Sequence, residues 1–195
     1  ARTLKKGLLG QLLTRGIGHK KFKQTEIGEI PVEWEVATLQ SCCEGGLLSD
    51  GDWIESKDQD PNGSVRLIQL ADIGDGVFID KSRRFINDNT FRRLKCVALQ
   101  DGDILIARMP DPIGRACLFP KLPTPAITAV DICIVRVSRA NNVYIGFVIN
   151  SPFYRTIISQ NISGSTRQRV PTGYLKFIPF PLPPLPEQKQ IAEIL

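Results

Sequence analysis

The sequence predicts a mixed α/β domain of the α+β kind, with short, mostly antiparallel strands, a few short helices and a helical fragment at each end. With 195 residues and 42% hydrophobic content, the chain is large enough for one domain with an apolar core. Short apolar runs rich in Val and Ile alternate with turns rich in Gly and Asp, which is typical of short strands. A regular alternation of strands and helices is missing, so a Rossmann sheet is excluded.

Composition and periodicity divide the chain into four parts. They are a helical fragment at residues 1–15, a linker at residues 16–31, a globular body at residues 32–183 and the start of another helix at residues 184–195. Pro31 prevents a helix from running through the linker. Because short helices are marginal alone, each terminal helix is expected to pack against another element or chain.

Both terminal helices carry apolar residues at helical spacing. Leu4, Leu8 and Leu12 fall four residues apart and predict one apolar stripe. Near the other end, Pro186 is expected at the first position of the helix, where Glu187 faces the positive end of the helix dipole. The candidate residues for contact with a partner helix are Leu4, Leu8, Leu12, Ile191 and Leu195.

A proline-rich run, Pro181–Pro186, leads into the second helix. Because proline fixes φ at about −65°, the run predicts a stiff, extended spacer between the body and the helix. Pro181 and Pro184 also match a minimal SH3-ligand pattern, which leaves a docking role as the alternative.

Within the body, apolar runs and turn signals predict several strands and two helices. Residues 65–80 are expected to form a hairpin or a bent strand pair around Gly74–Gly76. Ser151-Pro152 is expected to separate the two helices. The predicted strands are Val65–Leu70, Val77–Ile79, Ile104–Ala107, Gly114–Phe119 and Ile127–Val137, and the predicted helices are Tyr144–Asn150 and Pro152–Gln160.

Charge is segregated along the sequence. The net charge is +5. Residues 1–24 carry seven basic residues and no acidic one, residues 25–60 carry ten acidic residues against Lys57 alone, and residues 61–195 carry an excess of seven basic residues. This pattern favours a surface that faces a polyanion and an acidic region kept away from it. Ordinary solvated faces are the alternative.

The sequence lacks the usual motifs for catalysis, metal binding or nucleotide binding. The one histidine, His19, lies in the basic linker and is expected to face solvent or nucleic acid. The five cysteines have no Cys-x-x-Cys spacing, so they are expected to be reduced, buried thiols, and no metal site is predicted. Dinucleotide-binding and phosphate-binding glycine loops are missing. We predict no catalytic residue and no cofactor in this chain, and a rigid turn at Met109–Pro112.

Arginines in turn-rich segments are the candidates for contacts with nucleic acid. Arginine can bind guanine through two parallel hydrogen bonds, glutamine can do the same for adenine, and Ser, Thr and Lys suit phosphate. The segment Ser165–Arg169 holds both kinds of residue. An ordinary hydrated loop is the alternative. The candidate DNA-binding residues are Arg83, Arg84, Arg108, Arg115, Ser165, Thr166, Arg167, Gln168, Arg169 and Lys176.

Four segments resemble the specificity (S) subunits of Type I restriction–modification systems. Residues 178–195 resemble the junction that ends a target-recognition domain and opens a long conserved helix. Residues 23–34 resemble the segment that begins such a domain, and residues 4–13 resemble the tail of the preceding conserved helix. Inside the body, residues 99–108 followed by residues 113–115 resemble the family's strand–turn–strand.

The resemblance implies a target-recognition domain at residues 32–183, similar to the small DNA-binding domain of some adenine methyltransferases, between helices of an antiparallel coiled coil. In such a family each recognition domain reads one half of a bipartite site on double-stranded DNA, and the helices fix the gap. Methylation (M) subunits carry S-adenosylmethionine, and restriction (R) subunits use ATP and Mg²⁺ to translocate and cut. The S subunit itself is non-catalytic.

A whole S subunit has two recognition domains, whereas one is expected here. Because a helix tail precedes it, we expect the second half of an S subunit, with a half-length subunit as the alternative. A cytoplasmic protein without membrane contact is also expected, because the sequence has neither a membrane-length apolar run nor a signal peptide. The resemblance implies a prokaryotic source. A protein-interaction adaptor, which docks partners through its terminal helices and proline run, remains the alternative function.

Overall fold

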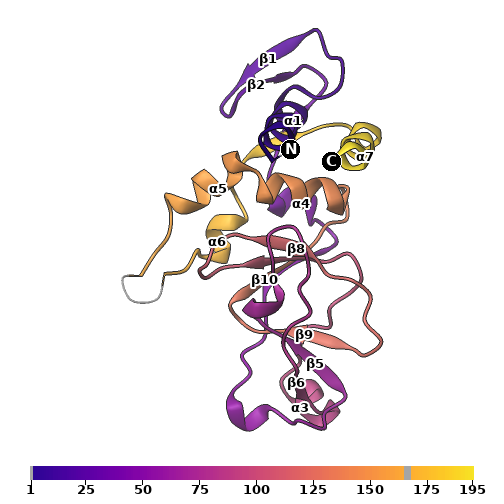
Figure 1. Ribbon diagram of the computed structural model, residues 1–195, viewed down its shortest axis with the longest axis vertical. Coiled ribbons are helices and arrows are strands. Elements are labelled where there is room, and N and C mark those ends of the chain that lie inside the picture. Colours follow the sequence, from indigo (N-terminus) through magenta and orange to yellow (C-terminus); the bar gives the residue numbers. More distant parts are fainter. Residues whose placement is uncertain (1, 165–167) are drawn as a thin grey trace.

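The computed structural model describes residues 2–164 and 168–195, with side chains from residue 7 onward (Figure 1). The helices are α1 (Arg2–Arg15), α2 (Leu39–Cys42), α3 (Asp88–Arg93), α4 (Asn142–Asn150), α5 (Pro152–Ser159), α6 (Thr172–Leu175) and α7 (Leu185–Ile194). The strands are β1 (Phe22–Thr25), β2 (Gly28–Pro31), β3 (Glu35–Ala37), β4 (Leu47–Asp50), β5 (Val65–Ile68), β6 (Arg84–Ile86), β7 (Ile104–Ala107), β8 (Ala116–Leu118), β9 (Ala126–Thr128), β10 (Ile132–Arg136) and β11 (Phe180–Leu182). Short 3-10 turns are η1 (Ser56–Asp58) and η2 (Leu70–Asp72).

A four-stranded antiparallel sheet, in the order β4-β10-β7-β8, forms the centre of the body. Alternate residues of β7 point to opposite faces. Ile104 and Ile106 pack with Tyr144 and Val148 of α4, while Leu105 and Ala107 join a second apolar cluster. Both faces are therefore covered, which explains why β7 is apolar throughout.

A smaller sheet, in the order β6-β5-β9, lies at the lower end of the molecule with α3 beside it (Figure 1). β5 pairs antiparallel with β6 and parallel with β9. The sheet has its own apolar cluster, to which Val65, Leu67 and Ile86 contribute. The predicted α+β class with mostly antiparallel strands is confirmed.

The two terminal helices come together at the upper end of the molecule, where both chain termini lie (Figure 1). Leu12 and Leu13 of α1 and Ile191 of α7 share one apolar cluster with Tyr144 of α4. The helices have 14 and 10 residues, so the long helices of a coiled coil are not part of this structure.

The strand at Ile104–Ala107 and the helices around Tyr144–Asn150 and Pro152–Gln160 are confirmed, whereas two expected strand arrangements are wrong. Residues 65–80 do not form a hairpin, because β5 takes β6 and β9 as partners and only an isolated bridge joins Ile73 to Phe78. The run Ile127–Val137 is divided between β9 and β10, which belong to different sheets. The polar Asp131 lies at the break, where it binds Arg169.

The structure also changes the expectations for the N-terminal region. Residues 16–31 are not a bare linker, because β1 and β2 form an antiparallel hairpin there. Leu12 and Leu13 are buried and Leu9 packs beside them, but Leu8 is 40% exposed. Residues three and four apart share a helix face, so the buried stripe contains Leu9, Leu12 and Leu13 and is shifted away from the predicted Leu8. The side chain of Leu4 lies outside the described residues.

At the other end, the proline-rich run is less of a free spacer than expected. Phe180–Leu182 pairs as β11 with β3, and α7 begins at Leu185, which places Pro186 at its second position. Ile191 is fully buried against the body of the same chain, and Leu195 packs partly against the same cluster. Helix α4 packs against α7 of the same chain, and contact of these residues with a partner helix stays a prediction.

Candidate nucleic-acid interface

The candidate recognition loop, residues 163–169, is closed at its base by the backbone. The amide of Ser163 donates to the carbonyl of Arg169 at 3.0 Å, and the amide of Arg169 donates back at 2.9 Å. The next amide, that of Val170, donates to the carbonyl of Arg108 at the end of β7. The two ends of this segment are therefore tied to each other and to the end of β7. The candidates Ser165, Thr166 and Arg167 lie outside the described residues.

Arg108 supports this loop from below and is not placed to read bases. Its side chain is 6% exposed, and Nη2 donates to the carbonyl of Val130 at 3.0 Å. Nη1 lies 3.3 Å from the carboxylate of Asp50, which also accepts a hydrogen bond from the hydroxyl of Thr172. The guanidinium thus joins β7, β4 and α6. In this structure the charge of Arg108 is bound inside the protein, and its DNA contact stays a prediction.

Arg115 is also a structural residue. Its guanidinium donates to four backbone carbonyls at 2.7–3.1 Å, those of Leu70, Ile73, Met109 and Pro112. Burial lowers the pKa of Arg115, and nearby Asp111 partly offsets this effect. The side chain therefore holds the turn at Met109–Pro112, and its DNA contact stays a prediction.

Gln168 and Arg169 both lie at the surface, but they differ in exposure and in their partners. Gln168 is exposed. Arg169 is bound to the carboxylate of Asp131, in the turn between β9 and β10, and its side chain is 35% exposed. Asp131 thereby fixes the outgoing side of the loop. The side chain of Gln168 is thus accessible to solvent, while that of Arg169 is held by Asp131.

A hollow of about 320 Å³ borders the recognition loop. One wall is the turn with Pro110, Asp111 and Pro112, and the opposite wall is α5, with Gln168 at the rim. Asp111 is exposed. Two loops from different parts of the chain therefore flank one concave surface.

The remaining arginine candidates lie in the smaller sheet. Arg83 is 61% exposed beside Asp80, at 3.2 Å, and Arg84 begins β6 with its guanidinium 3.4 Å from the amide oxygen of Gln59. Lys176 is half-buried, at the end of α6, and its carbonyl accepts from the amide of Gln40. Arg83 and Arg84 do not form one cluster with the recognition loop, because they belong to the other sheet.

The start of α7 contacts the segment that follows α1, and this junction was not predicted from the sequence. The carboxylate of Glu187 accepts hydrogen bonds from the amide of Ile17 at 3.0 Å and the indole of Trp34 at 2.9 Å, and it lies 2.8 Å from Nε2 of His19. The expected solvent-facing role of His19 is wrong, because its side chain is only 18% exposed. Gly16 has φ +65°, and a Cβ there would lie 2.5 Å from Glu187. Gly16 is therefore the residue in the sequence that could have indicated this close approach.

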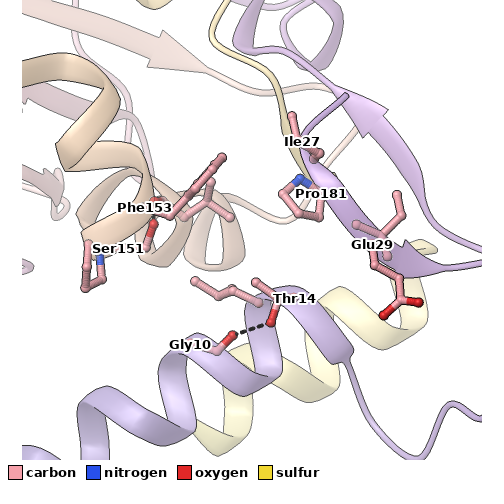
Figure 2. A pocket seen from close by; sticks show the side chains of 11 residues that line it. Gly10, Thr14, Ile27, Glu29, Ser151, Phe153 and Pro181 are labelled. Atoms are coloured by element: carbon pink, nitrogen blue, oxygen red, sulfur yellow. Dashed lines mark hydrogen bonds between the residues drawn. The ribbon is translucent and has the colours of Figure 1, made fainter. Parts of the chain in front are cut away.

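An apolar cavity of about 160 Å³ lies between α1, the β1–β2 hairpin and the α4–α5 junction (Figure 2). Its polar groups are already satisfied: the hydroxyl of Thr14 donates to the carbonyl of Gly10 at 2.8 Å, and Glu29 pairs with Arg15. No polar group is left to orient a ligand there.

Among the described residues, no group of three or more His, Cys, Asp or Glu side chains is placed to hold a metal ion. All five cysteines are free and buried, as expected. Burial raises the pKa of Cys42 and Cys96 to about 11, so these thiols stay protonated at neutral pH. In the described part of the chain, no helix is both long and apolar enough to span a membrane.

These features are those of an α+β binding domain with an anchored surface loop. The chain belongs to the family described as Type I restriction modification DNA specificity domain, whose model matches residues 31–195. The chain is 28% identical over 197 residues to the Type I restriction enzyme MjaVIII specificity subunit of Methanocaldococcus jannaschii, a match that covers 98% of this chain and 45% of the relative. The putative MjaX specificity subunit of the same organism is 26% identical over 182 residues, covering 90% and 42%.

Solved structures show the same fold. The HsdS subunit from Thermoanaerobacter tengcongensis superposes with a TM-score of 0.67 at 16% identity, covering 99% of this chain and 41% of that one. A chain from a structure on complex assembly and conformational transition of the type I R-M system gives a TM-score of 0.70 at 17% identity, covering 99% and 42%. This chain spans less than half the length of the relatives it matches.

Proposed function

We propose that this chain reads one half of a bipartite target on double-stranded DNA, as a recognition domain of a Type I restriction–modification specificity subunit. The observation that carries the proposal is the family match over residues 31–195. The anchored recognition loop supports it, because a reader must hold its side chains in a fixed register. Gln168 and the neighbouring residues 165–167 are the proposed base-reading residues.

The proposal also includes the partners. Methylation subunits carrying S-adenosylmethionine dock on the specificity subunit and modify adenine, and restriction subunits supply ATP- and Mg²⁺-dependent translocation and cleavage. The chain itself is non-catalytic and works in the complex by positioning these subunits on DNA.

An exchange of domains tests the proposal. Residues 32–183 are replaced by the matching residues of the MjaVIII specificity subunit in the assembled methyltransferase, and modified adenines are mapped by sequencing. We expect one half of the modified site to change and the other to stay. Exchange of residues 2–15 alone is the matched control and should leave the site unchanged.

The adaptor alternative makes the opposite prediction. If the exchange of residues 32–183 left the modified sequence unchanged while the complex still assembled, recognition would lie elsewhere and the proposal would be wrong. Incubation of the pure chain with DNA and either Mg²⁺ or S-adenosylmethionine should produce neither cleavage nor methylation.

A further inference from the structure

Trp53 is the most exposed large apolar side chain among the described residues, with 68% of its surface accessible to solvent. The other tryptophan, Trp34, is 1% exposed in the core. A tryptophan side chain offers a large apolar area, and such residues are usually buried at least in part. Its exposure therefore calls for a reason.

The backbone around Trp53 is held firmly, so its exposure does not come from a loose loop. The amide of Asp52 donates to the carbonyl of Thr128 at 2.8 Å, and the carboxylate of Asp52 accepts from the amide of Val97 at 3.1 Å. On the other side, Ile54 packs into the apolar cluster of the smaller sheet. Trp53 is thus presented to solvent between two anchored neighbours.

Trp53 lies close in the chain to the groups that support the recognition loop. It follows β4 by three residues, and Asp50 at the end of β4 binds both Arg108 and Thr172. Asp52 pairs with Ala129 in the turn that also contains Asp131, the partner of Arg169. The segment that carries Trp53 and the base of the loop therefore meet at the same end of β4 and β10.

Two exposed cations pair with acidic residues of the segment that follows Trp53. Lys57 is 77% exposed and lies in η1, where its ammonium pairs with Glu55. Arg93 is 52% exposed and binds Asp58 at 2.6 Å. Glu55 and Asp58 are therefore paired with cations that remain accessible, which reduces the repulsion of phosphate by these two carboxylates.

We propose that Trp53 is a DNA-contacting residue that stacks on a base or enters between two base pairs, with Lys57 and Arg93 binding the flanking phosphates. An indole face accepts any base, and its insertion locally bends the duplex toward a larger contact surface. The inference rests on the proposed DNA recognition and adds a contact in the segment between the two sheets.

Fluorescence gives a direct test, because the chain contains only two tryptophans and Trp34 is buried. A duplex enriched by the chain from a randomised 30-bp pool is titrated into the protein, with binding followed in parallel by anisotropy of labelled DNA. We expect the emission of Trp53 to be quenched and its quenching by acrylamide to be suppressed at the same DNA concentrations that raise the anisotropy.

Variants add an energetic test. Trp53→Ala should weaken binding roughly tenfold to a hundredfold, and Trp53→Phe should retain most of the affinity because a ring remains. Val77→Ala is the matched control: Val77 is 58% exposed, and its loop contacts β8, at the opposite edge of the central sheet from β4. It should bind as the wild type does. Where the isolated chain binds too weakly, the fraction of target adenines modified by the assembled complex is the readout.

The outcomes separate the two proposals. Unchanged affinity of Trp53→Ala, together with unchanged fluorescence in a complex that anisotropy shows to be formed, overturns the role of Trp53 and leaves DNA recognition intact. Loss of assembly with the methylation subunit, with normal DNA binding, would make Trp53 a protein-docking residue and also overturn the inference. No sequence-dependent modification by the wild-type complex would refute DNA recognition itself.

Discussion

Arg108 and Arg115 bring positive charge into the interior, where most of their donors bind backbone carbonyls or a carboxylate. Backbone carbonyls at strand ends and turns lack partners within a ladder and must be satisfied when buried. The guanidinium is suited to this task because it presents five donors in a rigid plane. At the residue scale, Arg108 and Arg115 stabilise the loops from inside the protein, and this role does not identify what the loops bind.

Arg115→Ala should lower the free energy of unfolding by about 3 kcal/mol, because four backbone carbonyls, in one buried and three part-buried hydrogen bonds, lose a charged donor. Arg83→Ala is the matched control, since its pair with Asp80 is exposed and should contribute less than about 1 kcal/mol. Urea unfolding measures both. Normal stability of Arg115→Ala would show that these hydrogen bonds contribute little to folding and would leave Arg115 as a candidate DNA contact.

Gln168→Ala should cost about 1–3 kcal/mol of binding at the matched site and much less on other DNA, because a base contact is specific. Arg169→Ala and Asp131→Ala should weaken binding to all sequences alike, since both remove the same anchor. The double variant should then be no worse than either single one. A selective loss in Arg169→Ala would instead identify Arg169 as a reader.

Asp52 should make stability depend on pH. Burial raises its pKa from 3.8 to about 6, although the amide of Val97 partly opposes this. The folded state then binds the proton more tightly than the unfolded state, so the contribution of Asp52 is favourable at low pH and is lost as the pH rises from about 4 to about 6. Asp52→Asn should gain stability relative to the wild type across that interval, as measured by urea unfolding at each pH. A constant difference would contradict the prediction.

At the scale of elements, the junction around Glu187 joins the beginning of the body to its end. One carboxylate at the N-terminal turn of α7 accepts from Ile17 and Trp34 and lies beside His19. The helix N-terminus favours a negative charge at this position. The proline run was expected to act as a stiff spacer between the body and this helix. The contacts of Glu187 fix α7 against the segment that follows α1.

Glu187→Ala should destabilise the chain by about 2 kcal/mol, because the indole N–H of Trp34 and the amide of Ile17 lose their acceptor. Glu187→Gln should lose less, since an amide oxygen can still accept one of these bonds. Unfolding followed by the fluorescence of Trp34 measures the effect. Glu193→Ala, on the same helix, is the control and should be nearly neutral.

At the scale of the whole molecule, the charge pattern of the sequence is redistributed by folding. The acidic stretch 25–60 was expected to stay apart from the basic surface, but several of its carboxylates pair with arginines from other segments. Such pairs are Arg15–Glu29, Arg93–Asp58 and Arg139–Glu44. Much of the acidic stretch is thus neutralised in place, and the excess of five positive charges remains for a polyanion.

Binding of duplex DNA should therefore depend strongly on salt. If two or more phosphates are neutralised, affinity should fall at least roughly tenfold between 50 and 200 mM salt, because bound cations are released. Anisotropy titrations at several salt concentrations give the slope. An affinity independent of salt would argue against a phosphate-facing surface.

The sequence by itself determined the class of fold, the strand at Ile104–Ala107, the two helices after Asn141 and the buried, reduced state of the cysteines. These features depend on local periodicity and on apolar content, which one sequence displays directly. The resemblance at both edges of the body also pointed to the family that the comparisons established.

Only the tertiary structure decided which polar side chains are used internally. Arg108, Arg115 and His19 look like surface residues in the sequence, yet their partners lie far away in the chain or are backbone carbonyls that carry no sequence signal. The same holds for Trp53, whose exposure depends on how Asp52 and Ile54 are anchored. Local sequence patterns depend on neighbouring residues in the chain. The burial of a charge or of an aromatic ring depends instead on contacts between residues that are distant in the sequence.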